Sequence, residues 1–250
     1  MLSFAARRAA SLARPPVDLR PYLQADDCDQ GPRPLCLPFS VSAAHEMARS
    51  LVSSTAPEEL APEPLWSHCV QSGQATPQGT TLHAVGEALS SDGQPVLSAW
   101  RYNPLLGMAT EASPAAALST TWHIAQVIDM PLAHDGVETL IDDALSLSLP
   151  VVLVIEVTSQ FENPTAAGEI SVPPLTSPTN DYHSVLAVGA ATDATISTRR
   201  LLIRNSWGPR WGAGGYGWLP LDYLIGFAVQ AGLVDPASCR STPPPQNGTA

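Results

Sequence analysis

The chain has 250 residues, of which 44% are hydrophobic and 14% are charged, a balance typical of a globular protein with a sizeable core. The net charge of −11, with only 12 Lys and Arg residues, argues against nucleic acid or an anionic membrane as the main partner, because both require basic patches. No apolar run approaches the roughly 18 residues of a membrane span. We therefore expect neither a nucleic-acid nor a membrane partner.

The two ends of the chain differ from its middle. Residues 1–16 carry Arg7, Arg8 and Arg14 and no acidic residue, a composition that an organellar transit peptide also has. They lack the apolar core of a secretion signal, and we expect a flexible or short helical leader in a cytoplasmic protein. A folded domain is then predicted over residues 17–238. Residues 239–250 have too few large apolar side chains to pack and are predicted to be a disordered tail.

The stretch 29–39, DQGPRPLCLPF, places Cys36 at the opening of a predicted helix. Apolar residues then recur on one helical face, at Leu37, Val41, Ala44, Ala48 and Leu51. Unpaired backbone N–H groups and the positive end of the dipole lie at a helix N-terminus, and both favour a thiolate over a thiol. Cys36 is therefore a candidate nucleophile, although a lone cysteine is more often a small buried apolar side chain.

Two shorter helices are predicted after this one. The first lies within residues 57–69, after a proline-rich turn, and the second within residues 80–90, where Leu82, Val85 and Leu89 have helical spacing. Together with the helix at Cys36 they would form a helical lobe over about residues 25–115. Residues 98–113 are predicted to be irregular chain leading to a second lobe.

The second lobe is predicted over about residues 116–235 and combines one helix with several strands. Residues 135–150 form an amphipathic pattern, and the β-branched run 151–157 is typical of a buried strand. Further strands are expected at 183–190 and 199–208, followed by the glycine-rich turn 212–218. The polar segment 162–181 is too long for a simple connection, and we expect it to shape the surroundings of His183.

Three short motifs follow one another along the chain: Gln30-Gly31 with Cys36 and Phe39, then His183 with Val188-Gly189, then Asn205-Ser206-Trp207-Gly208. Together they resemble papain-like cysteine peptidases. The pattern of that family is Gln-Gly followed by Cys with Phe three residues on, then His opening an apolar strand that ends in Val-Gly, then Asn-Ser-Trp-Gly. The resemblance covers roughly residues 17–232 and points to a bacterial-type member without a long prodomain.

This resemblance implies an α+β fold of two lobes, with Cys36 on the helical lobe, His183 and Asn205 on the β-sheet or barrel lobe, and the active-site cleft between them. His183 would act as the general base, or as the imidazolium of an ion pair with Cys36. Asn205 would orient the imidazole. Gln30 resembles the family's oxyanion-hole residue, and Trp207 resembles the tryptophan that shields the His–Asn hydrogen bond from water.

The resemblance also extends to the substrate site and to the other cysteines. Residues 73–81 resemble a glycine-containing segment that pairs with extended substrate, so Gly79 and Trp207 are candidate substrate-binding residues; a simple turn is the alternative at Gly79. The family's secreted members have a disulfide-bonded cysteine just upstream of the nucleophile, and its absence here predicts free thiols in a reducing compartment.

No spacing of Cys and His residues suggests a zinc site, so neither a metal nor a cofactor is expected. The remaining histidines have no comparable sequence context, and each is interpreted as a structural or surface residue: His45, His68, His83, His123 and His134.

The function that the resemblance implies is that of a thiol-dependent peptidase, which hydrolyses peptide or protein substrates through a covalent acyl-enzyme. Pro34 and Leu35 are bulkier than the small pair usual before the nucleophile, and Leu37 replaces the usual tryptophan. These departures leave two alternatives. One is a dedicated peptide-processing or acyl-transfer enzyme of the same chemistry, and the other is a non-catalytic papain-like module that binds a peptide.

Overall fold

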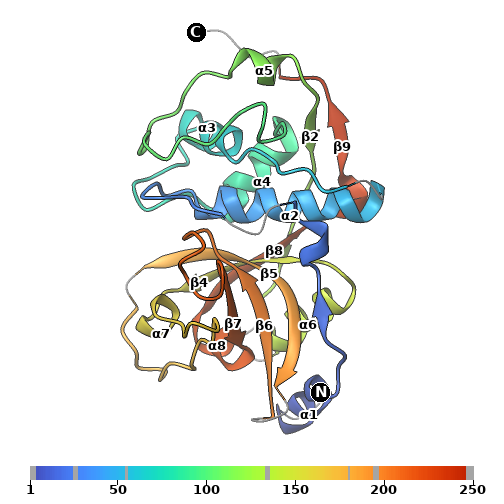
Figure 1. The fold of residues 1–250 in the computed structure, drawn as a ribbon, viewed down its shortest axis with the longest axis vertical. Coiled ribbons are helices and arrows are strands. Elements are labelled where there is room, and N and C mark those ends of the chain that lie inside the picture. The colour runs from blue at the N-terminus through green and yellow to red at the C-terminus, as the bar shows by residue number, and fades with distance from the viewer. Residues whose placement is uncertain are drawn as a thin grey trace. The chain divides into compact units, whose positions relative to one another are not determined.

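The structure is a computed structural model that describes residues 4–24, 28–53, 56–132, 136–179, 181–193 and 197–245 (Figure 1). The chain divides into two compact units. The sheet unit comprises Met1–Pro21, Asp26–Cys28 and Met130–Ala231, and the helical unit comprises Tyr22–Ala25, Asp29–Asp129 and Gly232–Ala250. In the described part of the chain, no helix combines the length and the apolarity needed to cross a membrane.

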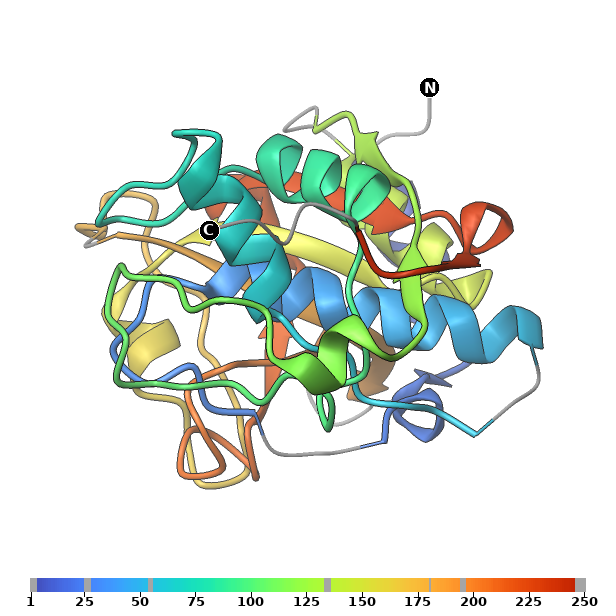
Figure 2. The same cartoon turned by 90° about the horizontal axis from the view of Figure 1, so that it is seen from above.

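Three helices form the centre of the helical unit. They are α2 (Cys36–Ser53), α3 (Glu63–Gln71) and α4 (Leu82–Ser91), and α3 and α4 pack against each other and against α2 (Figures 1 and 2). The apolar face predicted for α2 is fully buried at Val41, Ala44 and Ala48. All three predicted helices are therefore present, and α2 begins at Cys36 as expected.

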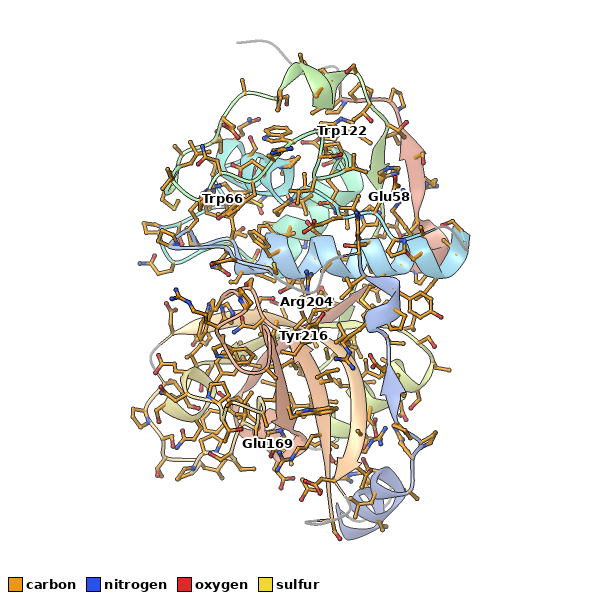
Figure 3. The ribbon with its side chains drawn as sticks, in the orientation of Figure 1. Glu58, Trp66, Trp122, Glu169, Arg204 and Tyr216 are labelled. Atoms are coloured by element: carbon orange, nitrogen blue, oxygen red, sulfur yellow. The ribbon has the colours of Figure 1, made fainter. Side chains whose placement is uncertain are left out.

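Large aromatic side chains fill the rest of this unit. Trp66 on α3 is fully buried, and Trp122 on β2 (Trp122–Ile124) packs edge-on against Trp100 with ring centroids 6.3 Å apart (Figure 3). The indole N–H of Trp122 donates to the carbonyl of Ala117 on α5 (Ala115–Leu118) at 2.8 Å. Residues 98–113 contain no helix or strand, as predicted.

The prediction of a disordered tail over residues 239–250 is wrong for its first residues. β9 (Arg240–Thr242) pairs antiparallel with β2, and the short 3₁₀ helix η2 (Pro236–Ser238) precedes it. Backbone pairing holds this segment, so its lack of large apolar side chains does not prevent order. The boundary of the helical unit also differs from the prediction, because residues up to Asp129 and the segment from Gly232 onward belong to it. Residues 246–250 lie outside the described part of the chain.

An antiparallel sheet forms the core of the sheet unit. Its strands have the order β8 (Ala228–Val234), β4 (Val151–Glu156), β5 (Tyr182–Asp193), β6 (Thr198–Arg204) and β7 (Tyr216–Pro220). β1 (Val17–Asp18) also pairs with β5, and β3 (Val127–Met130) neighbours β8. The strands predicted at 151–157, 183–190 and 199–208 correspond to β4, β5 and β6. Their near-continuous apolar runs reflect burial on both faces.

One glycine permits a close approach of two strands in this sheet. The pairing of β5 with β6 shifts register between Ala187 and Gly189, and β1 crosses at the same place, with Asp18 opposite Gly189. A Cβ atom on Gly189 would lie 2.5 Å from the carbonyl oxygen of Val17. A residue with a side chain would therefore push β1 away from β5.

The other elements of the sheet unit are helices and short turns. They are α1 (Phe4–Leu12), the 3₁₀ helix η1 (Arg20–Tyr22, shared with the start of the helical unit), α6 (Val137–Ser146), α7 (Ser159–Glu162) and α8 (Leu221–Phe227). α6 is the predicted amphipathic helix, and its apolar face packs against β4, β5 and α8. Residues 163–179, which follow α7, contain no helix or strand.

Of the two forms expected for the leader over residues 1–16, flexible or short helical, the structure has the helical one in α1, which contacts α6 and β6. The buried carboxylate of Asp142 on α6 anchors this segment, because it accepts from Ser11 Oγ at 3.1 Å and lies 3.1 Å from Arg14 Nη1. Arg199 on β6 donates to the same carboxylate through Nε and Nη2, and also to the carbonyls of Arg14 and Pro15. Polar groups therefore hold a segment that has little apolar surface.

Candidate active site

Cys36 is the first residue of α2, and its side chain is half-buried. The N–H of Phe39 donates to the carbonyl of Leu35 at 3.0 Å, which closes the first turn of the helix around Cys36. Pro38 lies within this turn, where the absence of its N–H costs no intrahelical hydrogen bond. The thiol therefore lies at the end of the helix where N–H groups gather, the position that the sequence predicted.

Gln30 lies in the same unit, on the loop before α2, and its side chain is buried. Its side-chain amide donates through Nε2 to the carbonyl of Arg33 at 2.7 Å. The hydroxyl of Tyr102 donates to the backbone carbonyl of Gln30 at 2.6 Å. Both ends of this residue are thus held, and its amide is fixed close to the turn that leads into Cys36.

The sheet unit brings His183, Asn205 and Trp207 together. His183 is buried near the start of β5, and its Nε2 lies 2.6 Å from Oδ1 of Asn205, which follows β6. The indole of Trp207 lies over the imidazole, with ring centroids 4.5 Å apart and an angle of 37° between the planes. The predicted pairing of these three side chains is therefore present in the structure.

The hydrogen bonds of Asn205 determine which nitrogen of His183 carries a proton. The backbone N–H of Ser206 donates to Oδ1 of Asn205 at 2.8 Å, so this atom must be the amide oxygen rather than the nitrogen. An oxygen can only accept, so Nε2 of His183 must be the donor in their 2.6 Å contact. In the neutral ring Nδ1 then holds the lone pair and is the atom that can take up a proton.

Burial lowers the pKa of His183 to about 4, although its hydrogen bond to Asn205 and the charge of Asp181 both act to raise it. The imidazole is therefore neutral at pH 7. Desolvation disfavours the charged form, and the aromatic rings of Trp207 and Phe161 are part of the surroundings that exclude water.

Phe161 is a site residue that the sequence analysis missed. It lies on α7, is fully buried, and packs against Trp207 with ring centroids 5.4 Å apart and against His183 at 5.9 Å. Its backbone carbonyl accepts the indole N–H of Trp211 at 3.1 Å. Its only sequence signal is a single aromatic residue at the start of the long polar segment, which periodicity does not distinguish from ordinary core.

Gly79 adopts a turn conformation with φ of +123°, and its N–H and carbonyl both bond to Thr76, at 2.9 and 2.7 Å. The turn that the sequence offered as the alternative is therefore the local structure. A role for Gly79 in binding substrate stays a prediction. The turn lies beside the nucleophile loop, because a Cβ atom on Gly79 would be 3.5 Å from the carbonyl oxygen of Pro34.

Two of the remaining histidines, His45 and His123, are buried within the helical unit. Nδ1 of His45 accepts a hydrogen bond from the side-chain amide Nε2 of Gln94 at 2.9 Å, and burial lowers the pKa of His45 well below its usual value. Burial also lowers the pKa of His123 to about 4. In the described part of the chain no three His, Cys, Asp or Glu side chains are grouped to hold a metal ion. His134 lies outside the described residues.

Comparison with solved structures identifies the class of fold as papain-like. Xylellain, a cysteine protease from Xylella fastidiosa, is 20% identical with a TM-score of 0.71 over 90% of this chain and 88% of its own. The bromelain protease from Ananas comosus, solved in complex with the E64 inhibitor, is 18% identical with a TM-score of 0.66 over 89% of this chain and 99% of its own. The predicted α+β papain-like fold is thus confirmed.

The sequence model of the papain family cysteine proteases matches residues 29–223, and the chain belongs to this family. The range includes Gln30, Cys36, His183 and Asn205. A local match to Cysteine protease 1 from Oryza sativa subsp. japonica is 53% identical over 38 residues. It spans 15% of this chain and 8% of the rice protein.

Proposed function

We propose that the protein is a cysteine peptidase that hydrolyses peptide bonds in peptide or protein substrates. The observation that carries this proposal is the hydrogen-bonding pattern of His183, whose Nε2 is committed to Asn205 and whose Nδ1 is left as the basic atom. Family membership supports Cys36 as the partner of that base. Cys36 lies at a helix N-terminus, where a developing thiolate is stabilised.

In the proposed reaction Sγ of Cys36 attacks the carbonyl carbon of the scissile bond while Nδ1 of His183 takes the thiol proton. The negative charge on the tetrahedral oxygen is stabilised by the N–H of Cys36 and the side-chain amide of Gln30. His183 then gives its proton to the leaving amine, and the C–N bond breaks to form a thioester. Water, deprotonated by His183, attacks the thioester, and the acid and the free thiol are released.

The low pKa of His183 favours one of the two roles that the sequence allowed. A pKa of about 4 keeps the ring neutral at pH 7, which is the protonation state that a general base requires. An imidazolium paired with a thiolate would need the charge of Cys36 to offset the burial of the ring. We therefore assign His183 as the general base in the resting enzyme.

The surroundings of two other cysteines make them poor nucleophiles. Cys69 and Cys239 are free thiols, and burial raises the pKa of both, that of Cys239 to about 11. A thiol that stays protonated is a poor nucleophile. These residues therefore supply controls for the assignment of Cys36.

The test uses an epoxysuccinyl probe of the E64 type and an unbiased mixture of peptide substrates. We expect a single adduct at Cys36, located by mass spectrometry, and loss of both adduct and hydrolysis in Cys36→Ala. Cys239→Ser is expected to retain both. Hydrolysis that survives in Cys36→Ala would reject the proposal. Labelling without hydrolysis would favour the alternatives: a new amide product in the presence of an amine acceptor would indicate acyl transfer, and no turnover a binding module.

A further inference from the structure

Arg33, three residues before Cys36, is held by hydrogen bonds through every nitrogen of its side chain. Its guanidinium is fully buried and forms a double hydrogen bond with the carboxylate of Glu63, at 2.6 Å from Nη1 and 2.9 Å from Nη2. Nε donates to the carbonyl of Gly107 at 2.9 Å, Nη1 to Asn103 at 3.0 Å, and Nη2 to Ala109 at 3.0 Å. All five N–H bonds of the side chain therefore have acceptors.

These acceptors come from two separate parts of the helical unit. Glu63 is the first residue of α3 and is itself fully buried, while the three carbonyls belong to the irregular segment 103–109. Glu63 also raises the pKa of Arg33 against the opposing effect of burial, so the guanidinium stays charged. The loop before Cys36 is therefore tied to α3 and to residues 103–109 at once.

The backbone of Arg33 links the same point to the oxyanion donor and to α2. Its carbonyl accepts the side-chain amide of Gln30 at 2.7 Å and the N–H of Leu35 at 2.9 Å. The carbonyl of Leu35 in turn accepts the N–H of Phe39 at 3.0 Å, in the first turn of α2. One short chain of hydrogen bonds thus runs from the Gln30 amide, through Arg33, to the helix turn that carries Cys36.

Tyr102 closes this arrangement from the other side. The Arg33 guanidinium lies over the Tyr102 ring, 5.2 Å from its centroid, and the Tyr102 hydroxyl donates to the carbonyl of Gln30 at 2.6 Å. The ring also packs edge-on against Phe39, with centroids 4.8 Å apart. Tyr102 therefore contacts the Arg33 guanidinium, the Gln30 carbonyl and the Phe39 ring at once.

We propose that Arg33 is a positioning residue, which, with Glu63 and Tyr102, fixes the Gln30 amide relative to the backbone N–H and thiol of Cys36. This inference rests on the proposed function, since it assigns a role in that reaction. The two oxyanion donors must be placed where charge develops in the transition state, and a displacement of about 1 Å costs roughly 100-fold in rate. Lysine cannot replace Arg33, because a single ammonium has three donors and no planar fork.

The experiment compares Arg33→Lys with a matched control, Arg199→Lys. Arg199 is likewise buried, forms a double hydrogen bond with one carboxylate, and donates to two backbone carbonyls, but it lies in the sheet unit and anchors the N-terminal segment. Both variants should unfold at lower urea concentrations than the wild type. For the folded proteins, kcat of Arg33→Lys should fall by about 10- to 100-fold with KM changed by less than about threefold, whereas kcat of Arg199→Lys should stay within about twofold.

Tyr102→Phe provides a second variant, in case Arg33→Lys does not fold. It keeps the ring beneath the guanidinium and against Phe39, and removes the hydroxyl that donates to the Gln30 carbonyl. We expect kcat to fall about fivefold because the Gln30 amide is held less firmly, while the urea midpoint shifts only by the effect of one lost hydrogen bond.

The inference is overturned if Arg33→Lys loses no more activity than Arg199→Lys, or, should Arg33→Lys not fold, if Tyr102→Phe keeps the wild-type kcat. In either case an active wild type leaves the proposed function standing. A wild type without hydrolysis would reject both.

Discussion

The side-chain oxygen of Asn205 accepts two hydrogen bonds at once, one from the ring of His183 and one from the backbone of Ser206. This double acceptance holds the imidazole in one tautomer and one orientation. The amide nitrogen of Asn205 is buried and has no hydrogen-bond partner among the residues that the structure describes. Such an unsatisfied group is costly in a core and is typical of a site where function constrains the residue.

The protonation of His183 predicts the acid side of the pH–rate profile. The base must be neutral to accept the thiol proton, so kcat/KM should fall as the pH drops through about 4, the pKa of His183. Asn205→Asp would place a negative charge beside Nε2, favour the imidazolium, and move this limb to higher pH. The measurement is kcat/KM against pH for both proteins, and an unshifted limb in Asn205→Asp would contradict the assignment of the base.

A second prediction at this scale concerns Gln30. Its amide is proposed to stabilise the tetrahedral oxygen, which bears full charge only in the transition state and intermediate. Gln30→Ala should therefore lower kcat by about 10- to 1000-fold and leave KM nearly unchanged, as is usual for one oxyanion donor. Steady-state kinetics on a single peptide substrate provides the measurement, and a kcat near the wild-type value would assign Gln30 a purely structural role.

At the scale of elements, the attachment of α1 depends on one buried carboxylate. Asp142→Ala would leave Arg199 buried without its counter-charge, and we expect a loss of about 3–5 kcal/mol in the free energy of unfolding. The neighbouring Asp143 also pairs with Arg14, but its side chain is 56% exposed, so Asp143→Ala should cost no more than about 1 kcal/mol. Urea denaturation of the two variants separates these outcomes, and equal losses would show that α1 is not held through Asp142.

Elements with strong periodicity were predictable from the sequence, and those held by backbone pairing were not. α2, α4 and α6 repeat apolar residues on one face, and β4 to β6 each contain a run of apolar residues, β-branched in β4, so their type and place followed from burial alone. β9 and β1 have no such pattern, because they are short and depend on the strands beside them. β8 was missed because its run AVQAGLV follows α8 without a turn signal.

In the candidate site, residues that belong to short sequence motifs were predictable, and residues that are paired only by the fold were not. His183, Asn205, Gln30 and Cys36 lie in short motifs whose order along the chain is specific, and their local surroundings could be inferred. Arg33 and Glu63 could not, because the sequence separates them by thirty positions and gives no sign that two charged residues share a fully buried position. Their pairing depends on where the loop and α3 meet, which only the folded unit specifies.

For the molecule as a whole, three buried histidines predict a loss of stability in mild acid. Burial lowers the pKa of His123 and His183 from 6.5 to about 4, and that of His45 well below 6.5. Between pH 6.5 and 4 the unfolded chain therefore binds protons that the folded chain does not. The free energy of unfolding should fall through this window, by up to roughly 3 kcal/mol for each of His123 and His183, and remain unaffected by them above pH 7.

Urea denaturation at pH 7.5, 6.0 and 4.5 measures this dependence. His123→Gln should flatten the decline between pH 6.5 and 4.5, because its side chain no longer takes up a proton on unfolding. His83→Gln is the matched control, since the side chain of His83 is 73% exposed. A decline that is equally steep in both variants would contradict the role of burial at His123.

The helical unit is built mainly from two stretches of chain, Asp29–Asp129 and the segment from Gly232 onward, and the residues between them belong to the sheet unit. The two stretches are joined by the pairing of β2 with β9. During synthesis on the ribosome, α2, α3 and α4 emerge long before that closing segment. Folding of this unit is therefore completed only after more than a hundred further residues have been translated, and until then the edge of β2 that pairs with β9 has no partner strand. Because such distant pairings are slow to form, nascent chains stalled before Gly232 should be more easily degraded by proteases in the helical unit than chains released after Thr242.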